Sequence, residues 1–444
     1  MAATSYYRNT NMTLRLSAWR NALRKESTKV RSLNTPPGET PVKEETVLHY
    51  KPEHYYPINI DDMYKTRYQV TDKIDYEAYS TSWLCWDLQD NKYNVLKVST
   101  SLPKFPKATD REIKIYEHLT TINSAHPGQS LMRELYDSFD LQGPVSKHCC
   151  LVLQPMRMSL LEMMGLNSRP FDLPLLKMTI KRVLSALDFL HIEAAIIHTE
   201  LDLKTDNLML SLEDTAMLAD FAKAEAKNPS PRKKVDESRI IYKSRRFRPP
   251  SGGKGYGLPI LCDFGEARIG KAHESGPFVQ PNIYRAPEII FEMPWGSAVD
   301  IWNLAGLIWN LFEGEHLFGD IFDTKGGHDP FKHLALMVAL IGQPPSEYVR
   351  RSDTTKQCFD PNGKHPTFSL KFWRSDHSSG ASTYVGGWIA HEDAAIPLVS
   401  LESLERRLSG QEKASFIQFM RSMLKWLPEE RRTAKQLLED PWLL

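Results

Sequence analysis

The pattern of hydrophobic residues in this chain changes at Pro155. Before that residue, apolar and polar side chains alternate in the segments 68–74 and 92–98, as they do in β-strands with one buried face. After it, apolar residues recur at every third or fourth position in the segments 180–190 and 301–312, as they do along one face of a helix. A strand-rich part followed by a larger helical part predicts an α+β fold with a small N-lobe and a larger helical C-lobe.

The composition limits the class of protein to which the chain can belong. It has 444 residues, more than one compact core needs, and 41% of them are hydrophobic and 25% charged. These values exclude a wholly disordered chain, a collagen-like chain and a coiled coil. The 56 basic and 55 acidic side chains almost cancel, which gives no reason to expect binding to nucleic acid or to an anionic membrane. No apolar run approaches the ~20 residues that cross a bilayer, and a monomer is the default expectation.

The sequence divides into four parts by composition. Residues 1–44 carry eight Lys or Arg against three Glu, which indicates a disordered basic tail or, alternatively, a mitochondrial presequence. An N-terminal extension over 45–66 leads into an N-lobe over 67–156 and a C-lobe over 157–444. Within the C-lobe, residues 222–259 form a predicted inserted spacer, whose basic stretch indicates a solvated loop or, alternatively, a nuclear address or a docking strip. We therefore expect the protein in the cytoplasm or the nucleus, with the mitochondrion as the alternative.

Three side chains in one short segment have the chemistry that phosphoryl transfer needs. Asp202, Lys204 and Asn207 lie in the run Asp-Leu-Lys-Thr-Asp-Asn, which follows a helical stretch. A carboxylate can orient the attacking hydroxyl, a cation can stabilise the migrating phosphoryl group, and a neutral oxygen can bind Mg²⁺. Taken alone, the segment is also compatible with an ordinary surface turn.

Further motifs follow in the order expected for the same chemistry. Asp263 leaves an apolar strand in Leu-Cys-Asp-Phe-Gly and is placed to ligate a metal, and Lys97 lies on a strand ahead of Glu112 in the next helix. Glu288, in Ala-Pro-Glu, is predicted to form a buried ion pair with Arg431. Each motif alone has a structural explanation, such as a surface charge or a helix cap. Together and in this order, they indicate one phosphoryl-transfer site.

With these motifs, the chain resembles a eukaryotic protein kinase over roughly residues 60–444. More narrowly, it resembles the SR-protein kinases, and among them the fungal branch, through His198-Thr199, the segment 263–268 and Tyr-Arg-Ala-Pro-Glu at 284–288. The resemblance implies a bilobal fold with ATP between the lobes. It also implies transfer of the γ-phosphoryl group of ATP to Ser or Thr of a protein substrate, with Arg-Ser repeats favoured.

The resemblance implies a role for each residue of the catalytic motifs. Asp202 would be the base-like residue, and Lys204 would stabilise the transferring phosphoryl group. Asn207 and Asp263 would hold Mg²⁺. A lysine two residues after the aspartate matches the serine/threonine kinases and not the pattern of many tyrosine kinases.

Five further residues are implied to bind or orient the nucleotide. Lys97 would contact the phosphates of ATP, and Glu112 would orient Lys97. The remaining contacts would come from Ile74, which directly precedes the expected phosphate loop, from Leu153 at the gatekeeper position and from Met156 in the hinge.

Two features depart from the kinase pattern. The loop expected to cover the phosphates, residues 75–79, contains no glycine, although glycine lets backbone N–H groups approach phosphates closely. Asp75 and Glu77 are expected on one face of a strand, where both would repel the triphosphate. In addition, three residues and not one separate His198 from Asp202, which predicts either a bulge or a shifted register.

These departures leave two functions open. The retained phosphoryl-transfer residues favour a serine/threonine protein kinase with reduced activity, whereas the missing glycines favour a pseudokinase that acts as a binding or scaffold protein. The arginine that precedes the catalytic aspartate in kinases, and that reads a phosphate on the activation loop, is missing here, and Thr199 lies in the matching region. We therefore expect an active enzyme to need no activation-loop phosphorylation.

Overall fold

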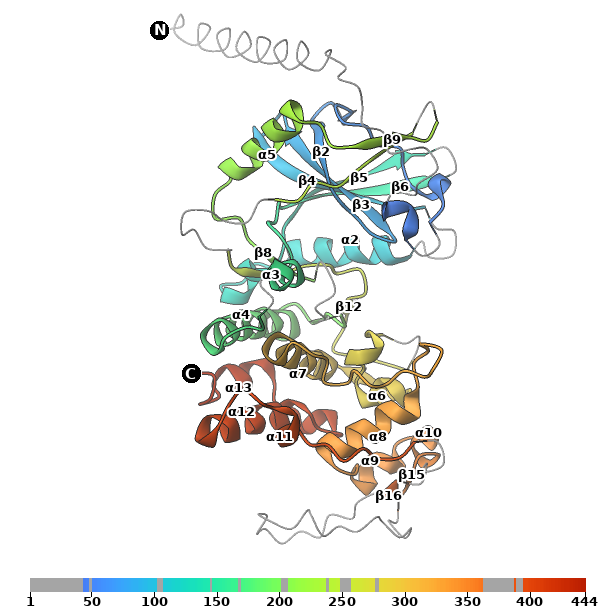
Figure 1. Ribbon diagram of the computed structural model, residues 1–444, viewed down its shortest axis with the longest axis vertical. Coiled ribbons are helices and arrows are strands. Elements are labelled where there is room, and N and C mark those ends of the chain that lie inside the picture. Colours follow the sequence, from blue (N-terminus) through green and yellow to red (C-terminus); the bar gives the residue numbers. More distant parts are fainter. Residues whose placement is uncertain are drawn as a thin grey trace, which may run out of the picture. The chain divides into compact units, whose positions relative to one another are not determined.

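The structure described here is a computed structural model. It describes residues 43–47, 50–101, 107–143, 146–166, 169–200, 207–236, 239–247, 257–275, 279–361, 387–388 and 394–444. Residues 1–42 of the predicted tail lie outside these ranges. The contacts between residues divide the chain into two compact units, and Figure 1 labels many of their helices and strands. The first unit consists of Met1–Pro106, Glu134–Arg157 and Leu212–Gly257, and the second of Lys107–Arg133, Met158–Ser211 and Leu258–Leu444.

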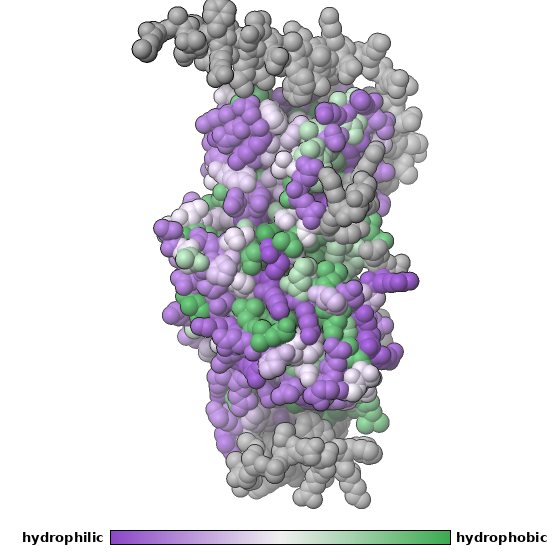
Figure 2. All heavy atoms as spheres, turned by 90° about the vertical axis from the view of Figure 1, so that its left-hand side faces the viewer, coloured by the Kyte–Doolittle hydropathy of each residue, from purple (hydrophilic) through white to green (hydrophobic). Residues whose placement is uncertain are grey.

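This division differs from the predicted lobes in two places. Residues 107–133, which include helix α2 (Lys107–Thr120), belong to the second unit, although the predicted N-lobe contained them. Residues 212–257, which contain most of the predicted spacer, belong to the first unit. On the face shown in Figure 2, hydrophilic side chains predominate and hydrophobic ones gather in smaller areas. No helix among the described residues has the length and apolarity needed to cross a membrane.

A six-stranded antiparallel sheet forms the centre of the first unit, with the strand order β1-β2-β3-β4-β6-β5. The strands are β1 (Met63–Tyr64), β2 (Tyr68–Tyr76), β3 (Ser80–Asp87), β4 (Lys92–Ser99), β5 (Leu135–Gln142) and β6 (Lys147–Leu153). Two short 3₁₀ helices, η1 (Lys43–Thr46) and η2 (Pro52–His54), precede the sheet. The strands predicted at 68–74 and 92–98 are confirmed as β2 and β4.

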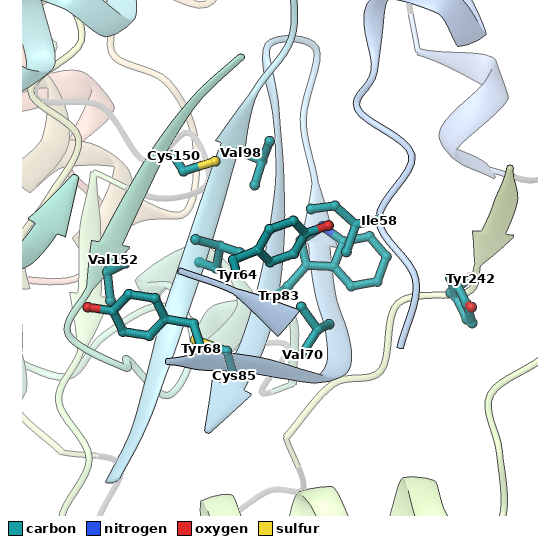
Figure 3. Close-up of a cluster of buried hydrophobic side chains, with 11 residues drawn as sticks. Ile58, Tyr64, Tyr68, Val70, Trp83, Cys85, Val98, Cys150, Val152 and Tyr242 are labelled. Atoms are coloured by element: carbon teal, nitrogen blue, oxygen red, sulfur yellow. The ribbon is translucent and has the colours of Figure 1, made fainter. Parts of the chain in front are cut away.

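One face of the sheet carries the core of the first unit, which Figure 3 shows in close-up. Alternate residues along each strand point to this face, among them Tyr68 and Val70 on β2 and Trp83 on β3, and these three are at most 3% exposed. Ile58 from the N-terminal extension and Tyr242 from the spacer join the same cluster. Burial of each large apolar side chain contributes roughly 1.5–3 kcal/mol, so the core itself holds the extension and the spacer to the sheet.

Helix α5 (Ala216–Lys227), whose second half lies in the spacer, covers part of the opposite face. Its Leu218 and Phe221 pack with Leu84 of β3 and with Phe247. The rings of Phe221 and Phe247 have their centroids 4.4 Å apart. Phe247 of the spacer therefore has a defined place on the sheet, together with helix α5.

The basic stretch of the spacer makes its contacts inside the first unit. Two short strands, β9 (Arg232–Lys234) and β10 (Ile240–Tyr242), pair as an antiparallel hairpin. Arg245 forms an ion pair with Glu225 of α5 at 2.7 Å, and Arg239 donates a hydrogen bond of 2.7 Å to a backbone carbonyl of the N-terminal extension. The prediction of a solvated loop is therefore wrong for the described part of the spacer, because Arg239 and Arg245 are bonded within the unit and Ile241, Tyr242 and Phe247 are buried.

The second unit is mainly helical. Its longer helices are α2, α4 (Leu173–Ile192), α7 (Ala298–Glu313), α8 (Pro330–Ile341) and α12 (Gly410–Met423). Its short helices are η3 (Pro127–Leu131), α3 (Leu160–Leu166), η4 (Asn282–Tyr284), α6 (Pro287–Ile290), α9 (Ser346–Arg350), α10 (Asp353–Lys356), α11 (Leu401–Leu404), η6 (Pro428–Glu430) and α13 (Ala434–Leu438). Its short strands are β7 (Ile196–Ile197), β8 (Leu208–Leu210), β11 (Pro259–Leu261), β12 (Arg268–Ile269), β13 (Ala272–His273), β14 (Trp295–Gly296), β15 (Phe359–Asp360) and β16 (Gly387–Trp388).

Helices α4 and α7 form the core of the second unit and confirm the helical periodicity of 180–190 and 301–312. Every residue of α7 from Val299 to Phe312 is buried. The predicted ion pair between Glu288 and Arg431 is also confirmed. Two parallel bonds of 2.6 and 2.7 Å join the carboxylate to the guanidinium group, and the two side chains are 1% and 0% exposed. Because both charges are buried, removing either one would leave the other buried without a partner and would lower the stability of the protein.

The first prediction concerns the buried carboxylate of Asp72. Asp72 pairs with Leu84 across β2 and β3, on the face that α5 covers, and is 1% exposed. Burial raises the pKa of Asp72 to about 7, and the nearby Glu225 adds to this rise. The folded protein therefore binds a proton at Asp72 more tightly than the unfolded chain does, so this group costs stability as the pH rises from about 4 to about 7.

Asp72→Asn should remove that cost. We expect the variant to gain free energy of unfolding over the wild type between pH 4 and pH 8, by at most about 4 kcal/mol, because one pKa unit corresponds to ~1.4 kcal/mol. Urea unfolding at both pH values measures the gain. Asp220→Asn changes an α5 carboxylate whose side chain is 76% exposed and serves as the control. The same pH dependence in both variants would contradict the prediction.

The second prediction concerns the buried ion pair of the second unit. Arg431→Met leaves the carboxylate of Glu288 buried without its partner, and we expect a loss of about 3–5 kcal/mol in the free energy of unfolding. Arg421→Met breaks an exposed pair with Glu402, joined at 2.8 Å, and should cost less than about 1 kcal/mol. Urea unfolding of both variants measures the two losses in the free energy of unfolding. Equal losses would contradict the prediction, because they would show that burial does not increase the cost of breaking an ion pair.

Candidate active site

Asn207 and Asp263 lie at the same end of a two-stranded ladder in the second unit. Strands β8 and β11 pair antiparallel, with Leu208 opposite Leu261. Asn207 directly precedes β8, and Asp263 is the second residue after β11. The backbone N–H of Cys262 donates to the carbonyl of Asn207 at 2.8 Å and continues the ladder. Backbone pairing therefore brings the two predicted Mg²⁺ ligands to one place.

Local hydrogen bonds hold the side chains of both residues. The Nδ2 group of Asn207 donates to the carbonyl of Glu200 at 2.6 Å, which fixes the direction of the amide oxygen. Asp263 has a φ of 55°, and its Oδ1 accepts the N–H of Gly265 at 3.2 Å. A left-handed conformation costs a residue with a side chain about 1–3 kcal/mol and persists only where the surroundings impose it. Aspartate is one of the residues that adopt this conformation most readily, and the bond to Gly265 supports it here.

His198 is buried beside this ladder. Its ring lies edge-on to Phe264, with the centroids 5.4 Å apart, and its Nε2 lies 3.0 Å from the carbonyl of Cys262. Its Nδ1 accepts the N–H of Glu200 at 3.4 Å. Burial lowers the pKa of His198. The ring is therefore neutral and carries its proton on Nε2, which donates to the residue that leads into Asp263.

A buried carboxylate on α7 holds the same segment from another side. Asp300 accepts the backbone N–H groups of His198 at 2.8 Å and of Thr199 at 2.7 Å, and it lies 2.8 Å from Nε2 of His191. Asn303, on the next turn of α7, donates to the carbonyl of Thr199 at 3.2 Å. These roles were not predicted. The available signal was an acidic residue in an otherwise apolar helical segment, which needs buried partners.

Asp202 and Lys204 lie in residues 201–206, outside the described residues, and their placement stays a prediction. The chain enters this segment from Glu200 and leaves it at Asn207, and these two residues are joined by the hydrogen bond described above. Thr199 has a φ of 66°, so the backbone turns sharply just where the two extra residues precede Asp202.

The predicted nucleotide residues are divided between the two units. Glu112 lies on α2 of the second unit and is buried. Lys97 on β4, Leu153 at the end of β6 and Met156 after it belong to the first unit, where Leu153 and Met156 are buried. Ile74 on β2 packs against the apolar cluster that α5 forms with the sheet. The predicted orientation of Lys97 by Glu112 stays a prediction.

The glycine-free loop is a tight turn that follows β2. The strand extends through Tyr76, and the N–H of Glu77 donates to the carbonyl of Ser80 at 2.8 Å. The pairing of β2 is irregular between Lys73 and Asp75. The carboxylate of Glu77 lies in the turn and accepts the hydroxyl of Ser80 at 3.0 Å. The prediction that Asp75 and Glu77 share a strand face is therefore wrong, because β2 ends between them.

The donor chemistry of the site suits a hard cation. Asn207 offers an amide oxygen and Asp263 a carboxylate, and oxygen ligands of this kind are what Mg²⁺ prefers. Within the ranges that the structure describes, no group of three or more His, Cys, Asp or Glu residues is arranged to hold a metal ion. A cation at this site would therefore share its coordination between these two residues and the oxygens of a substrate or water.

Comparisons with known proteins agree with this geometry. The family described as "Protein kinase domain" matches residues 68–251 and 254–443. A serine/threonine protein kinase of Aspergillus fumigatus is 38% identical over 405 residues, which cover 91% of each chain. Serine/threonine-protein kinase SRPK of Physarum polycephalum is 29% identical over 421 residues, covering 90% of this chain and 91% of the relative. SRSF protein kinase 3 of Homo sapiens is 21% identical over 546 residues, covering 91% of each.

Proposed function

Because the chain belongs to the protein kinase family, we propose that it is an active serine/threonine kinase that transfers the γ-phosphoryl group of ATP to a protein substrate. The observation that carries the proposal is the β8–β11 ladder, which brings Asn207 and Asp263 to one end beside a segment that Asp300 anchors. Phosphoryl transfer depends mainly on positioning and electrostatic stabilisation, and a rigidly held pair of oxygen ligands serves both.

Asn207 and Asp263 would hold Mg²⁺ in this proposal. When bound, the ion supplies positive charge that stabilises the phosphate oxygens. The protein contributes by fixing the two ligands before substrate arrives. Asn207 is held by Glu200 and by the ladder, and Asp263 is held by Gly265 and by its strained backbone.

Asp202 and Lys204 are assigned the base-like role and the stabilisation of the transferring phosphoryl group. Two observations support this assignment. The residues that flank 201–206 are joined by the bond from Asn207 to Glu200. The preceding residues, His198 and Thr199, are fixed by Asp300. A short segment between two fixed points is suited to the positioning that catalysis needs.

We assign Lys97 to the phosphates of ATP. The loop that would cover these phosphates contains no glycine, and the N-terminal extension holds it in place. The hydroxyl of Tyr55 lies 3.3 Å from the carbonyl oxygens of both Glu77 and Ala78. Burial raises the pKa of Tyr55 to about 12, so the hydroxyl keeps its proton and can donate to either oxygen. The extension thus sets the conformation of the loop without glycine.

We propose that the substrates are proteins rich in Arg-Ser dipeptides. The support is the relationship to a kinase named SRPK and to a kinase named SRSF protein kinase 3. We also propose that activity needs no phosphate on the segment 263–288. Thr199, which stands where kinases have the phosphate-reading arginine, is buried and donates its hydroxyl to the carbonyl of Glu266 at 2.8 Å.

A pseudokinase that acts as a binding or scaffold protein is the second candidate. It is favoured by the loop 75–79, which lacks the glycines that admit phosphates to the backbone, and by the two extra residues before Asp202. Nucleotide binding does not separate the two candidates, because a protein without turnover can bind ATP.

The third prediction is that the full chain phosphorylates an Arg-Ser repeat peptide with labelled ATP and Mg²⁺. Asp202→Ala should lower this rate by at least about a hundredfold, because it removes the group that orients the attacking hydroxyl. Treating the wild-type protein with a phosphatase beforehand should leave the rate unchanged. Thermal unfolding confirms that both proteins are folded. Incorporation no higher than that of Asp202→Ala would contradict the enzyme for this substrate class and favour the pseudokinase.

A further inference from the structure

Asp72 is a buried carboxylate on the face of the first unit's sheet that helix α5 covers. It lies opposite Leu84 across β2 and β3, so both side chains point to the same face, and it is 1% exposed. Leu84 packs with Leu218 and Phe221 of α5. Neither carboxylate oxygen of Asp72 has a hydrogen-bond partner among the described residues. A buried charge without a partner is strongly unfavourable, so this position favours the protonated acid.

The cation that acts on Asp72, Arg245, is bonded to a different carboxylate. Its Nε and Nη2 donate to Oε2 of Glu225 at 3.1 and 2.7 Å, and Nη2 also donates to the carbonyl of Asn228. Glu225 lies on α5, where it also accepts the backbone N–H and the hydroxyl of Ser230. The negative charge of Glu225 opposes ionisation of Asp72. The fork of Arg245 thus serves Glu225 and the turn after α5.

The other polar groups around Asp72 do not replace this missing partner. The hydroxyl of Thr71 favours the ionised form, but it donates its hydrogen bond to a backbone carbonyl of β3 at 3.2 Å. On β4, burial raises the pKa of Tyr93 to about 12, so this phenol keeps its proton near neutral pH. On α5, Asp220 is 76% exposed and pairs with Lys223. Asp72 is therefore the buried group at this contact whose charge can change near neutral pH.

Helix α5 is attached to the sheet through a small apolar contact. Its buried residues are Leu218, Phe221 and Glu225, and the two apolar ones meet Leu84 and Phe247. An element with few buried apolar contacts can open while the rest of its domain stays folded. Opening of α5 would admit water to the face of β2 that the helix covers, and a charge at that face would then be hydrated.

We propose that a proton on Asp72 controls the attachment of α5 to the sheet, so that the helix opens more often once this acid ionises. The direction follows from the two forms of the protein. Burial raises the pKa of Asp72 to about 7 when α5 is attached, whereas an exposed aspartate has a pKa of about 4. The attached form therefore binds the proton more tightly than the open form. Attachment weakens as the pH rises from about 4 to about 7 and changes little above that range.

The fourth prediction concerns hydrogen exchange of the α5 amides in the full chain, measured at about pH 5.5 and about pH 7.5 and corrected for the intrinsic exchange rates. In the wild type, protection of these amides should fall about 10- to 30-fold between the two pH values, because Asp72 ionises in that range. Asp72→Asn cannot ionise, so its protection should change less than about twofold. Asp220→Asn removes an exposed α5 carboxylate and should keep the fall of the wild type.

The amides of β6 distinguish release of α5 from opening of the whole first unit. Strand β6 lies between β4 and β5 in the same sheet. At about pH 7.5, the wild-type α5 amides should be at least about tenfold less protected than those of β6. Equal protection of the two elements would overturn the proposal, because the unit would then open as a whole. Wild-type α5 protection that stays within about twofold between the two pH values, or a full fall in Asp72→Asn, would also overturn it.

Discussion

One buried carboxylate, that of Asp300, fixes the segment from which the candidate active site is built. It accepts the backbone N–H groups of His198 and Thr199 at 2.8 and 2.7 Å, and neither group belongs to a helix or strand. A buried donor without a partner costs ~1–3 kcal/mol, so these bonds hold the segment to α7. His191 on α4 shares the carboxylate. Helices α4 and α7 thus hold the segment that leads, through Glu200, to the ladder that carries Asn207 and Asp263.

Charged side chains also hold other segments that lie outside helices and strands. The backbone N–H and C=O groups of such segments have no partners in a helix or a ladder, so charged side chains bond to them instead. Glu225 accepts the N–H and the hydroxyl of Ser230 and pairs with Arg245, which fixes the turn after α5. Burying such charges weakens a fold unless each is paired and hydrogen-bonded. Because the partners come from distant parts of the sequence, the pairs define one arrangement of the irregular segments.

The sequence predicted the strands and helices that depend on neighbouring residues. It missed the contacts between residues that lie far apart in the chain. The periodicity of 68–74 and 301–312 is a property of neighbouring residues, so β2 and α7 were predicted from it. The spacer was predicted as a solvated loop because its apolar residues are few and isolated among cations. Phe247 of the spacer becomes a core residue only because Leu84, far away in the sequence, offers a surface for it. Asp300 was missed as a positioning residue for the same reason, since its partners His198 and Thr199 lie in another motif.

The glycine-free loop changes which groups would bind phosphate under the proposed function. In kinases with a glycine-rich loop, backbone N–H groups share in binding the phosphates. Here the turn after β2 carries side chains and is fixed by Tyr55 and Ser80, so under the proposed function that contribution would be smaller. Under the proposed function, Lys97 then provides a larger share of the stabilisation. A single cation stabilises a phosphate only if it is positioned correctly. The predicted orientation of Lys97 by Glu112 therefore becomes more important.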